Sequence, residues 1–404
     1  MHEILSSRIL SMPASATLAM NQKAALLRQE GHDVIDLSLG EPDFLTPSHI
    51  RQAATEAIED GKCFSYPPVA GYMELRQAVV RKLHRENGVS CTPDQVVITN
   101  GAKQALINAL LCCVNPGDEV IVYTPYWVSY ISMIQLVGGV PVRLQGSAED
   151  GFEPTEAQLE AAVTKRTRAI LFSNPCNPTG HVFSKFSLEC IVGVLQKHPH
   201  VLAISDEIYE PIRFGQAHIS LAALPGAEGR VITVNGFSKG FAMTGWRIGY
   251  LVAPQRVAKA CEKLQGQMTS GVCGVAQKAA LAALTGEKEP VQTMVEAYRR
   301  RRDLCLELLQ QHTEFEIDKT PMGAFYLFVN ANRYLHQKIS ETAVSDTDAL
   351  CMLLLERAHV ALVGGAAFGV DQYIRISYAA SEALLREAFH RLKPALSALS
   401  ASPR

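Results

Sequence analysis

A lysine within a run of small residues is the side chain of this sequence best suited to covalent chemistry. Lys239 lies in the segment 238–249 (Ser-Lys-Gly-Phe-Ala-Met-Thr-Gly-Trp-Arg-Ile-Gly), and Arg247 follows it eight positions later. The apolar run 231–234 before it is typical of a buried strand. A lysine amine condenses with an aldehyde and an arginine can hold a phosphate, so the pattern indicates a Schiff base with pyridoxal phosphate. Taken alone, an exposed lysine without a catalytic role is the alternative.

Polar side chains that follow strand-like runs could hold such a cofactor. Asp206 ends the apolar run 201–205, where a buried carboxylate needs a partner such as a protonated pyridine nitrogen. Tyr209 could hydrogen-bond the 3-hydroxyl of the ring, and the two Asn-Pro pairs around Asn177 form a turn that can aim its amide. The alternatives are a helix cap for Asp206, a structural role for Tyr209 and turn formation alone at Asn177.

We expect a phosphate site at the bend 99–104 (Thr-Asn-Gly-Ala-Lys-Gln). Free backbone N–H groups and the helix dipole favour an anion where a strand passes into a helix. Arg247 would add a fixed positive charge, and Trp127, which follows another strand-like run, could stack on a flat ring or could simply be a core aromatic. The sequence contains neither a Walker P-loop nor a GxGxxG dinucleotide motif.

Arg375 is the residue that we expect to bind a substrate carboxylate. In the run 373–378 (Tyr-Ile-Arg-Ile-Ser-Tyr) the alternation places it on one face of a strand with Tyr373 and Ser377. A guanidinium binds a carboxylate through two parallel hydrogen bonds, as an amino acid or oxo acid requires. A structural salt bridge is the alternative.

The elements that position these residues alternate between strands and helices over residues 46–285. Strands at 96–99, 119–123, 169–173 and 201–205, with helices at 102–114 and 185–197, predict an α/β fold with a mostly parallel central sheet between helices. Ligands bind beyond the carboxyl ends of such strands. A helix at 291–311 and strands at 323–329, 360–363 and 373–377 predict a smaller α+β domain over 286–404, with fraying after about residue 393. Residues 1–45 would form an N-terminal arm and part of the small domain.

Composition excludes several other classes of protein. The chain has 404 residues, 48% hydrophobic and 19% charged, with a net charge of −2, which predicts a globular protein of two domains. The only cluster of basic residues, at 299–302, lies in a helical pattern and is expected on a solvated face, so we expect no nucleic-acid partner. No apolar run could span a membrane and no signal peptide is evident. The ten cysteines show no CxxC spacing, which predicts free thiols in a cytoplasmic protein without a metal site.

These motifs occur in the order typical of class I/II aminotransferases, and the sequence resembles that family over roughly residues 5 to 390. The matching segments are 40–43, 101–104, 177–180, 205–209, 238–239, 245–247 and Arg375. The resemblance implies the pyridoxal-phosphate-dependent transferase fold type I. It implies Lys239 as the Schiff-base lysine, Asp206 at the pyridine nitrogen, and Tyr209 and Asn177 at the 3-oxygen. The phosphate would contact Ser238, Arg247, Gly101, Ala102 and Lys103, and Gly40, Trp127, Asn177 and Arg375 would line the substrate.

The resemblance also implies a homodimer with shared active sites, because Tyr66 matches a tyrosine that reaches the phosphate of the partner subunit. One position departs from the family. Many members have the pattern Ser-x-Ser-Lys, whereas Gly236 stands at the first serine here. One phosphate contact is therefore missing or supplied by water.

The substrate is expected to be aspartate. The sequence resembles most closely the bacterial aspartate aminotransferases of the subgroup that includes aspartate/prephenate aminotransferases. Lys103 and Thr17 match residues that hold the distal carboxylate in that subgroup, so we expect ping-pong transfer from L-aspartate to 2-oxoglutarate. A lysine often found before the Pro-Ser-Ala-Thr motif is replaced here, where residues 12–14 are Met-Pro-Ala, which argues against prephenate. The alternatives are alanine, aromatic, kynurenine or prephenate donors, or a β-lyase, against which Thr17 and Lys103 argue.

Overall fold

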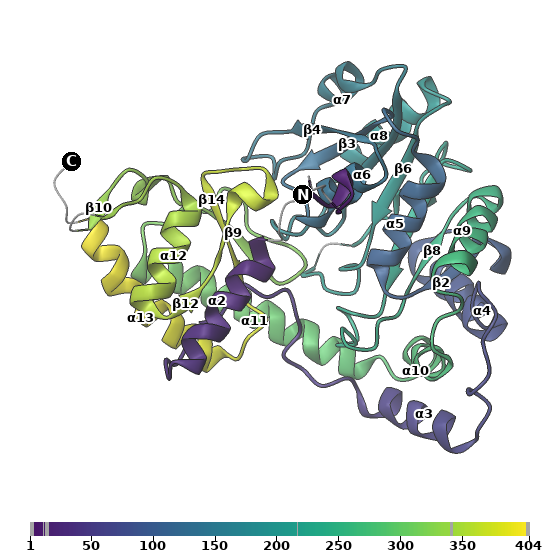
Figure 1. Ribbon diagram of the computed structural model, residues 1–404, viewed down its shortest axis with the longest axis horizontal. Coiled ribbons are helices and arrows are strands. Elements are labelled where there is room, and N and C mark those ends of the chain that lie inside the picture. The colour runs from purple at the N-terminus through teal and green to yellow at the C-terminus, as the bar shows by residue number, and fades with distance from the viewer. Residues whose placement is uncertain (1–3, 11, 13–15, 216, 340–341, 401–404) are drawn as a thin grey trace.

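The computed structural model describes residues 4–10, 12, 16–215, 217–339 and 342–400. Two groups of elements are evident in Figure 1. A seven-stranded sheet and its helices form the larger group, and a three-stranded sheet lies in the smaller one. The domain boundaries expected near residues 45 and 285 stay a prediction.

The larger sheet confirms the expected α/β architecture. Its strand order is β2-β8-β7-β6-β5-β3-β4, and all neighbours pair in parallel except β8, which runs antiparallel to both β2 and β7. The sequence analysis does not identify β4 or β8. The bounds are β2 Val96–Thr99, β3 Glu119–Thr124, β4 Val140–Gln145, β5 Thr167–Ser173, β6 Leu202–Asp206, β7 Val231–Gly236 and β8 Gly249–Val252.

Helices cover both faces of this sheet because its strands are apolar on both sides. Val120 and Val122 of β3 pack into a core with α5, α6 and α9, whereas Ile121 and Tyr123 of the same strand pack into a core with α7 and α8. A third core joins β2 and β8 to α3, α4 and α10. The bounds are α3 Ser48–Glu59, α4 Met73–Lys82, α5 Ala102–Cys113, α6 Ser129–Leu136, α7 Glu156–Ala162, α8 Lys185–Lys197, α9 Gln255–Met268 and α10 Gly274–Thr285.

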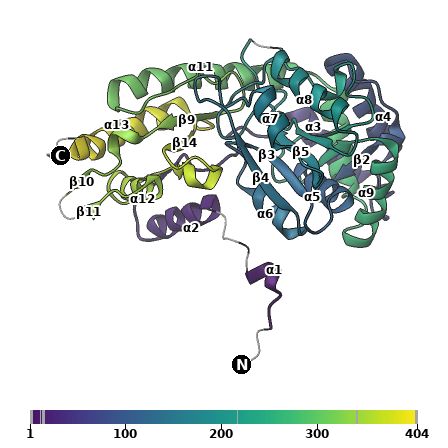
Figure 2. The same cartoon turned by 90° about the horizontal axis from the view of Figure 1, so that it is seen from above.

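The smaller group combines antiparallel strands with helices from both ends of the chain. The three-stranded sheet has the order β13-β14-β9, and β1 pairs in parallel with β12. Helix α11 extends from this group to the larger one (Figures 1 and 2). The bounds are α2 Ala16–Gln29, β1 Ile35–Asp36, α11 Glu289–His312, β9 Tyr326–Asn330, β10 Lys338–Ile339, β11 Thr342–Ala343, α12 Thr347–Ala358, β12 Val360–Ala361, β13 Val363–Gly364, β14 Tyr373–Ser377 and α13 Glu382–Ser400. A short helix, α1 Ser7–Leu10, lies outside both groups (Figure 2).

Three local expectations were wrong. The run 360–363 is not one strand, because β12 pairs with β1 while β13 pairs with β14. The chain does not fray at residue 393: α13 continues to Ser400, across Pro394, because Leu396 and Leu399 are buried in the core of the smaller group. The arginine cluster is not wholly solvated, since Arg301 is only 7% exposed. Among the described residues, no helix combines the length and the apolar character of a membrane-spanning segment.

Candidate active site

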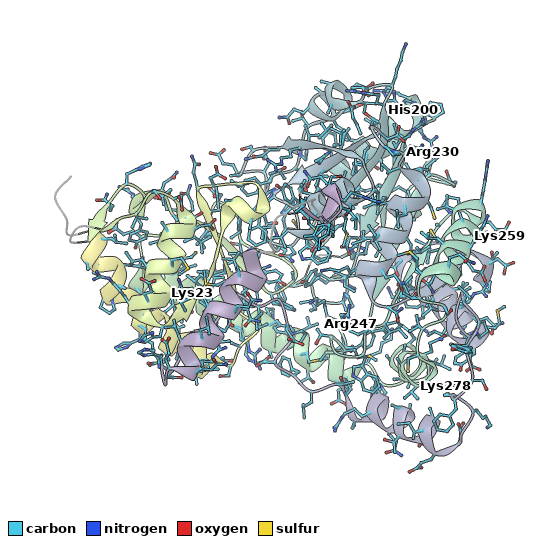
Figure 3. All side chains as sticks on the ribbon, in the orientation of Figure 1. Lys23, His200, Arg230, Arg247, Lys259 and Lys278 are labelled. Carbon is cyan, nitrogen blue, oxygen red and sulfur yellow. The ribbon has the colours of Figure 1, made fainter. Side chains whose placement is uncertain are left out.

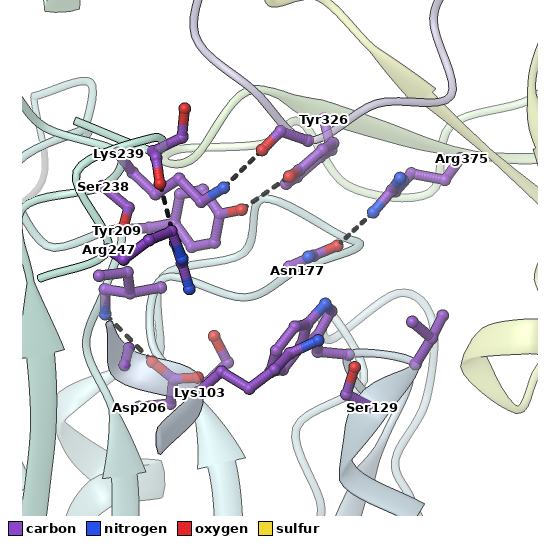
Figure 4. Close-up of a pocket in the computed structure, with 17 residues that line it drawn as sticks. Lys103, Ser129, Asn177, Asp206, Tyr209, Ser238, Lys239, Arg247, Tyr326 and Arg375 are labelled. Carbon is purple, nitrogen blue, oxygen red and sulfur yellow. Dashed lines mark hydrogen bonds between the residues drawn. The ribbon is translucent and has the colours of Figure 1, made fainter. Parts of the chain in front are cut away.

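The predicted residues meet in one cavity of about 320 Å³ beyond the carboxyl ends of the parallel strands (Figure 4). β6 delivers Asp206, the turn after β5 delivers Asn177, and the loop after β7 delivers Lys239. All of the predicted residues except Gly101, Tyr66 and Thr17 line this cavity, namely Gly40, Ala102, Lys103, Trp127, Asn177, Asp206, Tyr209, Ser238, Lys239, Arg247 and Arg375.

The three remaining predicted residues have different positions. Gly101 lies beside the cavity at the start of α5, and its φ of 79° favours glycine; a Cβ there would also come within 2.7 Å of Nη2 of Arg247. Tyr66 lies away from the cavity and is 95% exposed. Thr17 lies in α2, and its side chain is outside the part of the chain that the structure describes.

Lys239 lies at the wall of the cavity with its amine turned inward. Its Nζ donates a hydrogen bond to the carbonyl oxygen of Gly40 and lies 5.9 Å from the ring centroid of Tyr209. Burial lowers the pKa of the Lys239 amine to about 8, against an opposing effect of the Glu41 carboxylate. A lysine with this pKa can exchange protons near neutral pH.

Asp206 is a buried carboxylate that lacks a cationic partner within hydrogen-bonding distance among the described residues. Its Oδ2 accepts a bond of 2.7 Å from the hydroxyl of Tyr130, and Oδ1 accepts a bond of 3.3 Å from the amide of Ile208. Burial raises the pKa of Asp206 to about 6. The alternative of a helix cap is wrong, because residues 207–210 form no helix.

Arg375 lies between two aromatic rings at the opposite wall. Its guanidinium is 4.5 Å from the ring centroid of Tyr326 and 4.9 Å from that of Phe368. Nη1 donates to Oδ1 of Asn177 at 2.9 Å and Nη2 donates to the carbonyl oxygen of Ser38. It forms no ion pair with the acidic residues that the structure describes, so the alternative of a structural salt bridge is wrong. Its Nε is buried without a partner among the described residues.

A second positive charge reaches the cavity from α5. Nζ of Lys103 lies 4.9 Å from the ring centroid of Trp127, a cation–π contact that holds the amine beside the flat indole. Partial burial, with a further effect of Arg247, lowers the pKa of Lys103. Arg247 itself donates to the carbonyl oxygen of Thr244 at 2.8 Å.

Sequence analysis missed one residue that organises the site. The hydroxyl of Tyr326 lies 2.6 Å from that of Tyr209, and a Cβ on Gly40 would come within 2.2 Å of it. Tyr326 therefore limits position 40 to glycine. Its only signal in the sequence is its place in a predicted strand, which does not distinguish it from a core aromatic. Ser129, Ser173 and Thr244 also line the cavity and were not predicted.

The departure at Gly236 has a steric reason. This residue ends β7 opposite Gly249 of β8. A Cβ at position 236 would come within 2.9 Å of the Cα of Gly249 and 3.2 Å of Cδ1 of Ile208. A serine there would not fit without movement of the two strands, so the glycine is required by strand packing in this chain.

A buried lysine and a buried carboxylate lie beyond the carboxyl ends of the parallel sheet, and Arg375 on β14 of the smaller sheet lines the same cavity. The family model for aminotransferase class I and II matches residues 32–392, and the chain belongs to this family. The enzyme is therefore an aminotransferase, with an amino acid and a 2-oxo acid as substrates.

Known relatives match over nearly the whole chain. A bifunctional aspartate aminotransferase and glutamate/aspartate-prephenate aminotransferase of Petunia hybrida is 46% identical over 397 residues, which cover 97% of this chain and 82% of that protein. An aspartate/prephenate aminotransferase of Thermus thermophilus is 43% identical, covering 96% of this chain and 97% of the relative. The crystal structure of the aspartate aminotransferase of Rhizobium meliloti matches with a TM-score of 0.94 at 40% identity, covering 99% of this chain and 100% of that one.

Proposed function

We propose that this aminotransferase transfers the amino group of L-aspartate to 2-oxoglutarate and uses pyridoxal phosphate as its cofactor. The observation that carries the proposal is that two cationic side chains, Arg375 and Lys103, line the same cavity from different elements (Figure 4). Aspartate, oxaloacetate, glutamate and 2-oxoglutarate each carry two carboxylates, and each cation would bind one. The relatives named as aspartate aminotransferases support the same substrate.

The residues of the cavity fit pyridoxal phosphate. Asp206 is buried with only neutral donors, and a protonated ring nitrogen would supply the missing positive charge. Lys239 would hold the aldehyde carbon, and Tyr209 and Asn177 would hold the 3-oxygen. The phosphate would contact Ser238, Arg247 and the bend at Gly101, Ala102 and Lys103, where the start of α5 presents free N–H groups. When bound, the cofactor supplies an electron sink for negative charge that develops on the Cα of the amino acid.

The other side chains of the cavity would have separate roles in the reaction. Arg375 would bind the α-carboxylate, and its bond to Asn177 together with the two flanking rings fixes the plane of the guanidinium. Lys239 would accept and pass on the proton of the substrate Cα, since burial lowers the pKa of its amine to about 8. Trp127 would cover one face of the bound ring and exclude water. Lys103 and Thr17 would hold the distal carboxylate.

We further propose a homodimer in which Tyr66 of each chain completes the phosphate site of the other. Tyr66 and Phe64 are 95% and 74% exposed, and Ile4 is 93% exposed on the segment that leads to α1. Figure 2 shows α1 extending away from the rest of the chain. Exposed aromatic and aliphatic side chains on two such segments are typical of an interface.

The ten free cysteines favour a reducing compartment such as the cytoplasm.

A panel of amino donors tests the substrate. Purified protein loaded with pyridoxal phosphate is incubated with 2-oxoglutarate and aspartate, alanine, phenylalanine or kynurenine, and the glutamate formed is measured. We expect preference for aspartate, and we expect Lys103→Ala to reduce aspartate turnover while alanine turnover is spared. Lys259→Ala is the matched control, because Lys259 is exposed on α9, away from the cavity (Figure 3). Equal or better turnover of alanine or aromatic donors would contradict aspartate as the substrate.

Prephenate is a second candidate acceptor, because several of the relatives carry it in their names. Replacing 2-oxoglutarate by prephenate in the same assay, with aspartate as donor, measures this activity directly.

Release of pyruvate and ammonia from cystathionine without an oxo acid would instead indicate a β-lyase and would contradict the transaminase assignment.

A further inference from the structure

The segment 40–46 (Gly-Glu-Pro-Asp-Phe-Leu-Thr) makes contacts that the proposed reaction does not use. It runs between the cavity and helix α3, and it begins at Gly40, whose carbonyl oxygen accepts the hydrogen bond from Lys239. The position of this carbonyl therefore depends on how the segment is held.

Both ends of the segment bind the loop that carries Lys239. Near its start, Oε1 of Glu41 accepts a hydrogen bond from the hydroxyl of Thr244. At its end, the hydroxyl of Thr46 donates to the carbonyl oxygen of Ala242 at 2.6 Å and accepts from Nε1 of Trp246 at 3.0 Å. Both ends of the segment are thus connected to the part of the loop that follows the lysine, residues 242–246.

The middle of the segment is held by α11. Nη1 and Nη2 of Arg301 donate to the two carboxylate oxygens of Asp43 at 2.7 and 2.9 Å. The same guanidinium lies 4.8 Å from the ring centroid of Phe44, and that ring meets Tyr298 edge-on at 5.4 Å. Because a bidentate pair fixes both distance and orientation, this contact determines where Asp43 lies.

Arg301 differs in this respect from its neighbours on the same helix. Arg299 and Arg300 are exposed and lie next to Glu296 and Glu382, at 2.8 and 3.7 Å. Arg301 alone among these three is buried. Burying a guanidinium costs free energy unless its charge is compensated, and the carboxylate of Asp43 compensates that of Arg301.

We infer that Arg301 is a positioning residue for Lys239: its ion pair with Asp43 fixes the 40–46 segment so that the Gly40 carbonyl faces the lysine amine. The inference rests on the proposed role of Lys239. Without the pair, Asp43 loses its partner and Phe44 loses a face of its packing, while the bonds at Glu41 and Thr46 remain. The segment then keeps the hydrogen bonds at its two ends and loses the ion pair that holds its middle.

The test compares three full-length variants. Arg301→Met and Asp43→Asn remove the two halves of the pair, and Arg300→Met removes an exposed arginine from the same helix as the control. Hydrogen exchange of the amides in 40–46 is measured with and without bound cofactor, together with kcat and KM for aspartate. Labelling of Lys239 by reductive methylation is followed against pH in protein freed of cofactor.

We expect both pair variants to raise amide exchange in 40–46 about tenfold or more and to lower kcat about tenfold, with KM changed less than kcat. The pH dependence of Lys239 labelling should shift in both pair variants. Arg300→Met should leave amide exchange, kcat and the labelling of Lys239 unchanged. If Arg301→Met fails to fold, Asp43→Asn decides the question, because it keeps the shape of the side chain.

The inference is overturned if exchange in 40–46 rises while kcat and the labelling profile of Lys239 stay unchanged. It is also overturned if exchange rises equally over the whole chain, which would indicate general destabilisation. Failure of the proposed function gives a different result, namely transamination that survives in Lys239→Ala.

Discussion

The protonation of Lys239 can be tested without any assay of turnover. With a pKa of about 8, lowered by burial, about 9% of this amine is neutral at pH 7, against about 0.04% for a lysine at its ordinary value near 10.4. Only the neutral amine reacts with an aldehyde, so Lys239 should be labelled about 200-fold faster at pH 7 than an equally accessible lysine with the ordinary pKa.

The measurement is reductive methylation of protein freed of cofactor, over pH values from about 6 to 11, with peptide mass spectrometry of the Lys239 peptide. The exposed Lys259, read from the same digest, serves as the comparison lysine. We expect half-maximal reactivity of Lys239 near pH 8. Glu41→Gln should move the midpoint lower, because the Glu41 carboxylate raises the pKa of Lys239. A midpoint near the ordinary value of about 10.4 would show that the cavity does not lower the pKa of the Lys239 amine and would refute the reasoning.

Three further substitutions probe other walls of the cavity. Asp206→Asn should lower kcat about 100-fold, because it removes the negative charge that would keep the ring nitrogen protonated; thermal unfolding should change little, since an amide oxygen still accepts from Tyr130. Arg375→Lys should lower kcat/KM about 10- to 100-fold for aspartate and alanine alike, because both donors have an α-carboxylate that would lose its bidentate partner. Gly40→Ala should lower kcat/KM about 100-fold, since its methyl group would lie 2.2 Å from the Tyr326 hydroxyl, and adding Tyr326→Phe should restore part of the loss.

Much of the larger sheet could be predicted because its strands are short apolar runs that end at turn residues. The expected strand 96–99 and helix 185–197 have the same bounds in the structure. β8 is missed because its four residues, Gly-Tyr-Leu-Val, follow a glycine-containing loop without a pattern of their own. The division of 360–363 between two sheets depends on its partners, residues 35–36 and 374–375, and no local pattern records such pairing.

The residues of the candidate site also divide into those that the sequence predicts and those that it does not. Asp206 and Asn177 could be predicted because each follows an apolar run, and parallel strands bring their carboxyl ends to one edge of the sheet. Tyr326 and Arg301 could not, because each reaches the site through a contact with a distant part of the chain. Asp43 and Arg301 are 258 positions apart, and a run of four arginines does not reveal which of them turns inward.

The N-terminal segment connects the two charged ends of the cavity. Nη2 of Arg375 donates to the carbonyl oxygen of Ser38, and the carbonyl oxygen of Leu37 accepts from the amide of Ser377 on the same strand. Two residues after Ser38, the carbonyl of Gly40 accepts from Lys239. A displacement of β14 relative to the larger sheet would therefore move Gly40, because only residues 38–40 of the backbone separate the two contacts. For this reason the group that would bind the α-carboxylate and the group that would move the proton are linked through residues 38–40, although Arg375 lies on β14 and Lys239 lies in the loop after β7.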